Sequence, residues 1–79
     1  MPTRIISDII DGRPLISGTS DMTVRSACRL MAEKKIGALL VIDNNRIAGI
    51  FTERDALNKV LAGDLDPDAT QVAQVMVSN

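Results

Sequence analysis

The sequence has no histidine, no tryptophan, no tyrosine and only one cysteine, Cys28, among its 79 residues. Without histidine there is no imidazole base, no Cys/His zinc site and no Ser/His/Asp triad. A single cysteine cannot form an intramolecular disulfide, and a single Phe leaves almost no platform on which nucleic-acid bases could stack. With no Gly-rich phosphate loop either, we expect a protein that is not an enzyme, holds no metal and requires no cofactor.

Long apolar runs and an excess of one charge are also missing. The nine Lys and Arg residues nearly balance the ten Asp and Glu residues, so no basic footprint for nucleic acid or anionic lipid is present. The longest uninterrupted apolar run, residues 38–42, is far too short to cross a bilayer, and the N-terminus lacks the apolar core of a signal peptide. We therefore expect a cytoplasmic protein that binds neither nucleic acid nor membrane.

The length allows one domain of marginal stability. A chain of this size buries only about 60–65% of the surface that its unfolded form exposes. Burial of further apolar surface by a partner would stabilise it. We expect residues 1–79 to form a single unit that is either a homodimer or a fragment of a longer chain.

Hydrophobic periodicity and breaker residues predict a small α/β fold with two main helices. Thr23 is a suitable N-cap for the first main helix, and Gly37 could supply the left-handed turn that ends it. A continuously apolar strand follows, then a turn at residues 43–46 whose asparagines tolerate positive φ. The predicted elements are a helix over residues 3–11, a strand stub at 15–17, a helix from 23, strands at 38–42 and 47–51, a helix over 52–63, and a C-terminal linker over 64–79 that includes a short helix.

Three segments carry a family resemblance. They are residues 21–24 (DMTV), 35–43 (KIGALLVID) and 49–55 (GIFTERD). In that order and at those separations they resemble a CBS motif, the module named after cystathionine β-synthase, over roughly residues 13–63. Residues 70–76 (TQVAQVM) also resemble the linker that leads into a second motif, which this chain lacks. The resemblance implies a βαββα unit that forms one half of a CBS pair, or Bateman module, by packing sheet to sheet with a second copy.

The same resemblance implies a regulatory role. In many relatives AMP, ADP, ATP or S-adenosylmethionine occupies a cleft between two motifs and alters a partner enzyme or transporter. By family position the ribose would be held by Thr52 and Asp55, and a cation such as Arg54 at the start of the helix would favour a nearby phosphate. The adenine would be held by apolar side chains and backbone polar groups at Ile16, Ile36, Gly37, Ala38 and Ile50.

The chemistry of these residues fits that role and also a simpler one. Thr52 and Asp55 lie on one side of the first helical turn, where a hydroxyl and a carboxylate could meet the 2′ and 3′ hydroxyls of a ribose. The same pair could be a capping box that only stabilises the helix. Arg54 could equally be a solvated helix residue, and the apolar positions could be core or sheet-interface residues. The alternative function is therefore a dimerisation or interaction scaffold with no nucleotide ligand.

Cys28 lies on the apolar stripe of the first main helix, beside Val24 and Met31. A thiol in apolar surroundings behaves as a small hydrophobe, and its pKa is raised rather than lowered. We therefore expect Cys28 to have a packing role and no redox or nucleophilic role.

Overall fold

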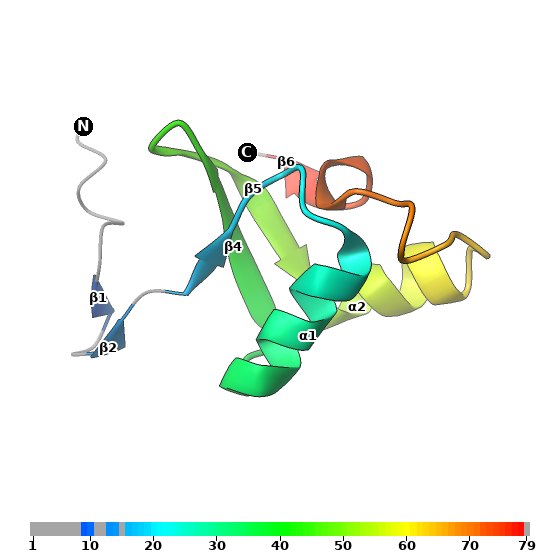
Figure 1. The fold of residues 1–79 in the computed structure, drawn as a ribbon, viewed down its shortest axis with the longest axis horizontal. Helices are drawn as coiled ribbons and strands as arrows, with labels where there is room; N and C mark the ends of the chain where they lie inside the picture. Colours follow the sequence, from blue (N-terminus) through cyan, green and yellow to red (C-terminus); the bar gives the residue numbers. More distant parts are fainter. Residues whose placement is uncertain (1–8, 11–12, 15, 79) are drawn as a thin grey trace.

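The computed structural model describes residues 9–10, 13–14 and 16–78, and the side chains of residues 16–78. A four-stranded sheet in the order β3-β4-β5-β6 forms one layer, and the helices form the second (Figure 1). The elements along the chain are β1 (Ile9–Ile10), β2 (Arg13–Pro14), β3 (Ser17–Gly18), α1 (Val24–Lys34), β4 (Ala38–Asp43), β5 (Arg46–Thr52), α2 (Glu53–Asp55), the π-helical turn η2 (Ala56–Leu61), the 3-10 turn η3 (Val72–Gln74) and β6 (Val77–Ser78). This mixed α/β unit with two main helices confirms the predicted fold class.

The sheet combines one parallel and two antiparallel pairings. β3 runs parallel to β4 and is joined to it through α1, whereas β4 and β5 form an antiparallel hairpin. Asn44 and Asn45 connect that hairpin with φ values of 53° and 63°, as the tolerance of asparagine for positive φ predicts. β6 completes the sheet by pairing antiparallel with the middle of β5.

The two ends of α1 differ in how well the sequence predicts them. Thr23 is the N-cap, and its side chain accepts a hydrogen bond from the backbone N–H of Ser26. At the other end, Lys35 and not Gly37 adopts the left-handed conformation, with φ 58°. The N–H of Lys35 then bonds to the carbonyl of Ala32 and the N–H of Ile36 to that of Met31, which satisfies two carbonyl groups of the last turn.

The hydrophobic core lies between the sheet and the two helices and includes the C-terminal segment. Val72 and Val75 are 0% and 4% exposed. The backbone of this segment binds the start of α1, because Val24 N–H donates to Thr70 O and Val72 N–H to Met22 O, each at 2.9 Å. The core residues are Val24, Ala27, Met31, Leu39, Val41, Phe51, Val60, Val72 and Val75.

The prediction of a C-terminal linker helix is therefore wrong. The helical spacing of Val72, Val75 and Met76 produces only the three-residue turn η3, and the chain then enters the sheet as β6. The physical reason is that closing over the core buries both valines and pairs the backbone with β5, which a projecting helix of this length could not do.

The predicted helix over residues 3–11 is also wrong where the structure describes it. Ile9–Ile10 form strand β1, paired antiparallel with Arg13–Pro14. The rest of that predicted helix, residues 3–8 and 11, lies outside the described residues. Consecutive β-branched residues such as Ile9 and Ile10 favour strands over helices.

Candidate functional site

Thr52 and Asp55 meet where β5 turns into α2. Thr52 is the N-cap, and its Oγ accepts a hydrogen bond from the N–H of Asp55 at 3.2 Å. In return, Asp55 Oδ2 accepts from the backbone N–H of Thr52 at 2.9 Å and from its hydroxyl at 3.1 Å. Asp55 is only 6% exposed. The reciprocal bonds are those of a capping box, which is one of the two interpretations that the sequence leaves open.

A third group binds the same carboxylate. Lys59 Nζ lies 3.2 Å from Asp55 Oδ1 and donates to the carbonyl oxygen of Val75 at 2.9 Å. Burial by itself would raise the pKa of Asp55, but the hydrogen bonds from Thr52 and Lys59 outweigh it, so the pKa lies below its ordinary value. Asp55 is therefore a carboxylate at neutral pH and can only accept hydrogen bonds.

The remaining hydrogen-bonding capacity of Asp55 is small. A carboxylate offers about four lone-pair positions. Three of them are taken, by the N–H of Thr52, the hydroxyl of Thr52 and the ammonium of Lys59. A ribose diol that donates two hydrogen bonds to Asp55 must therefore displace either the Thr52 hydroxyl or Lys59.

The sheet brings some of the expected adenine residues to the same place. Ala38 pairs with Thr52, and Ile50 lies two residues earlier on β5. Because side chains alternate along a strand, these residues share the sheet face opposite to buried Leu39 and Phe51. On this open face Ile50 is 38% exposed. The structure thus places Ala38, Ile50 and Thr52 together, with Asp55 beside them.

Ile16, Ile36 and Gly37 have other surroundings. Ile16 and Ile36 are partly buried and pack against the hydrophobic core. The carbonyl oxygen of Gly37 accepts a hydrogen bond from the N–H of Glu53 at 3.0 Å. A Cβ at Gly37 would lie 2.6 Å from Glu53 Oε2, at the far end of a flexible side chain that can move away. Through that hydrogen bond, Gly37 fixes the start of α2 beside β4.

Arg54 is exposed, and among residues 16–78 it forms no ion pair. Sequence reasoning assigned the cation of this region to Arg54 and missed Lys59. The signal was present, because Asp55 and Lys59 are four residues apart, which is the spacing of an ion pair along one helix face.

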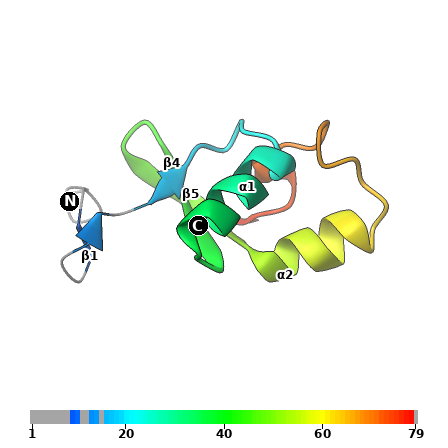
Figure 2. The ribbon, with the colours of Figure 1, turned by 60° about the horizontal axis from the view of Figure 1, so that its bottom comes forward.

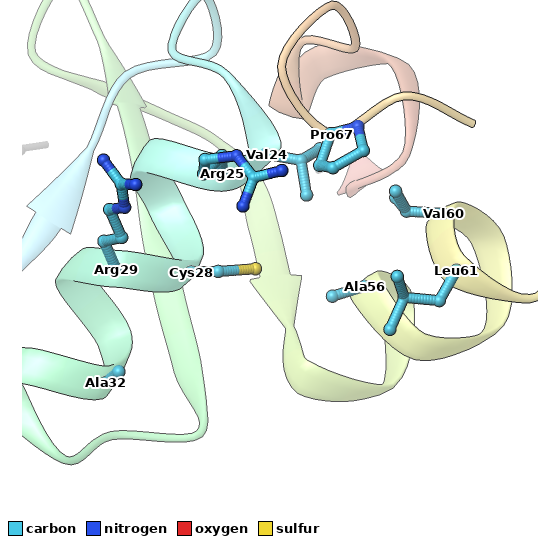
Figure 3. Close-up of a pocket in the computed structure, with 9 residues that line it drawn as sticks. All are labelled: Val24, Arg25, Cys28, Arg29, Ala32, Ala56, Val60, Leu61 and Pro67. Carbon is cyan, nitrogen blue, oxygen red and sulfur yellow. The ribbon is translucent and has the colours of Figure 1, made fainter. Parts of the chain in front are cut away.

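A separate hollow of about 280 Å³ lies on the helix side of the molecule (Figure 3). Figure 2 shows α1 and the helix that starts at α2 lying next to each other. Cys28 lines the hollow, and burial raises the pKa of its thiol against the opposing effect of Arg25, as expected for a packing residue. An adjoining hollow of about 270 Å³ includes Ile36, and Leu57 and Leu61 on its rim are 58% and 65% exposed.

The part of the chain that the structure describes contains no helix with the length and hydropathy needed to span a bilayer.

Comparison with known proteins identifies the family. The model of the CBS domain family matches residues 6–62. The meiotically up-regulated gene 70 protein of Schizosaccharomyces pombe is 40% identical over 73 residues, which are 90% of this chain and 10% of that protein. The chain thus spans about a tenth of the length of this relative.

Solved structures agree with that match. A protein with CBS domains from Burkholderia ambifaria is 42% identical, with a TM-score of 0.82 over 98% of this chain and 57% of that chain. A CBS domain protein from Pyrobaculum aerophilum complexed with AMP is 25% identical, with a TM-score of 0.75 over 84% of this chain and 51% of that chain. The match over residues 6–62, together with the shared fold, shows that the chain belongs to the CBS domain family.

Proposed function

We propose that the chain is a non-catalytic regulatory module that binds an adenosine-containing nucleotide in a cleft formed with a second CBS motif. The observation that carries this proposal is the position of the Thr52–Asp55 pair, at the edge of an open sheet face that also presents Ala38 and Ile50. The AMP complex of the Pyrobaculum aerophilum relative supports the choice of ligand class.

In this proposal each residue has a separate task. Asp55 accepts hydrogen bonds from the ribose hydroxyls, and the Thr52 hydroxyl, while it still donates to Asp55, accepts a hydrogen bond from the same ribose with its remaining lone pair. Ala38 and Ile50 contribute apolar surface for the adenine. The second motif comes from another copy of the chain or from a longer chain, and it closes the cleft over the open sheet face.

Regulation follows from binding between two motifs. A nucleotide that contacts both of them stabilises one relative orientation, and its differential affinity for two orientations is what a partner protein can respond to. The partner protein and the cytoplasmic location remain predictions from the sequence.

The alternative is a pairing scaffold without a ligand, and one observation favours it. The Asp55 carboxylate already has partners in Thr52 and Lys59, so its burial needs no ribose to explain it. A scaffold would form the same pair through the open sheet face and show no response to nucleotides.

Thermal unfolding with AMP, ADP, ATP or S-adenosylmethionine at about 1 mM separates the two functions. A nucleotide at 100 times its Kd adds about 2.7 kcal/mol, which for a domain of this size raises the Tm by roughly 10–20 °C. Sedimentation in parallel measures whether the chain is paired.

The test compares two matched variants. Asp55→Asn should abolish the nucleotide-induced rise in Tm. Asp64→Asn is the same change at an exposed residue and should keep that rise, because asparagine tolerates the φ of 60° found at position 64. A paired protein whose Tm responds to none of the four compounds would rule out the nucleotide-binding function and leave the scaffold.

A further inference from the structure

We propose that Lys59 is a positioning residue that couples the Asp55 carboxylate to the C-terminal strand β6. The inference rests on the proposed function for its biological meaning, because the coupling would transmit the effect of ribose binding at Asp55 to the C-terminal strand β6. Its physical basis is the single ammonium group that contacts both Asp55 and Val75.

The ammonium group of Lys59 lies between two segments of the chain. Lys59 Nζ lies 3.2 Å from Asp55 Oδ1 and 2.9 Å from the carbonyl oxygen of Val75. Asp55 belongs to the helix that follows β5, and Val75 follows η3, so these two contacts join segments that are 20 residues apart in the sequence. The Lys59 side chain is 46% exposed, which leaves it free to move if one contact is lost.

The pairing of β6 depends on the position of Val75. Val75 is buried, and β6 begins two residues later. β6 then packs closely on β5, since a Cβ at Gly49 would lie only 2.4 Å from the carbonyl oxygen of Val77. Because β6 contributes only two residues to the sheet, the anchoring of Val75 matters to its pairing with Gly49 and Ile50.

A bound ribose competes with Lys59 for the carboxylate of Asp55. Two hydrogen bonds from a ribose diol exceed the free capacity of Asp55, and the exposed Lys59 is easier to displace than the part-buried hydroxyl of Thr52. Once Asp55 no longer holds the ammonium group, Lys59 loses the second anchor that fixes it against Val75. Ribose binding therefore weakens the attachment of β6.

Hydrogen exchange of the amides in the β5–β6 pair tests the coupling without any nucleotide. Lys59→Met removes the ammonium group and keeps the apolar stem, and we expect it to raise the exchange rates of β6 about two- to fivefold. Lys34→Met, the same change at the exposed end of α1, should leave them unchanged. Equal exchange in the Lys59 and Lys34 variants would overturn the proposal.

A double-mutant cycle distinguishes coupling from simple attachment. If Asp55 acts on β6 through Lys59, Asp55→Asn should raise β6 exchange, and adding Lys59→Met should raise it no further. Additive effects of the two substitutions would contradict the coupling. Should Asp55→Asn fail to fold, the Lys59→Met and Lys34→Met comparison still tests the attachment of β6, and the response of β6 exchange to AMP tests the coupling.

AMP provides the last measurement and separates this inference from the proposed function. Saturating AMP should raise β6 exchange in the wild type and have no such effect in Lys59→Met. AMP that binds, as judged by the Tm, yet leaves β6 exchange unchanged in the wild type would overturn the coupling alone. AMP that fails to bind would count against the proposed function, and the nucleotide-free comparison would then decide the role of Lys59.

Discussion

Replacing Val72 by alanine should destabilise the domain far more than the same change at Val77. Val72 is fully buried in the core, whereas the side chain of Val77 is 54% exposed on β6. Val72→Ala removes the equivalent of two methylene groups, worth about 0.8 kcal/mol each, and leaves a small cavity, so we expect a loss of about 2 kcal/mol. Val77→Ala should cost less than about 0.5 kcal/mol.

Urea unfolding measures this difference at equal protein concentration. In thermal unfolding of a chain of 79 residues, the same loss of about 2 kcal/mol corresponds to a fall in Tm of roughly 8–16 °C. The dependence of the unfolding free energy on urea should stay the same in both variants, because the surface exposed on unfolding hardly changes. Similar losses for Val72→Ala and Val77→Ala would refute the inclusion of the C-terminal segment in the core.

Two further predictions concern the site and its edge. The pKa of Asp55 is lowered in the folded state, so its contribution to stability is present above the unfolded pKa of about 3.9 and is lost as the pH falls through the lower folded pKa. Asp55→Asn should therefore flatten the dependence of the unfolding free energy on pH in that range. An unchanged acid transition would contradict the lowered pKa of Asp55. Gly49→Ala should push β6 away from β5, because the new Cβ would meet the backbone oxygen of Val77 at 2.4 Å. Hydrogen exchange should then rise in the β5–β6 pair and not in the β4–β5 pair. Unaltered β6 exchange would show that β5 and β6 adjust to the new Cβ without weakening their pairing.

The central part of the fold could be predicted from sequence because its signals are local. Thr23 is a capping residue directly before an apolar stripe, and Asn44 and Asn45 are turn residues between two apolar segments. In both places the preferred local conformation agrees with the packing. The predicted helix start and hairpin turn therefore match the structure.

The two flanks could not be predicted because their structure depends on distant partners. Val72 and Val75 have helical spacing, but their burial against α1 and the sheet decides their conformation. Ile9 and Ile10 also have helical spacing with their neighbours, yet they pair with Arg13–Pro14. In each case a pairing partner outweighs the weak helical preference of a short segment.

The candidate site was predicted in part. The pattern Thr52-x-x-Asp55 correctly indicates two side chains that contact each other, as a capping box requires. It cannot show that Lys59 holds the same carboxylate while it binds Val75, because the second contact depends on where residue 75 lies in space. The ribose-binding role of the pair stays a prediction.

The short outer strands have a consequence for aggregation. β3 and β6 form the two edges of the four-stranded sheet, and each contributes only two residues. An edge this short offers an incoming chain few free backbone groups, so the sheet is a poor template for growth by strand addition into fibres. The domain can therefore leave an apolar sheet face available for a specific partner with little risk that copies polymerise edge to edge.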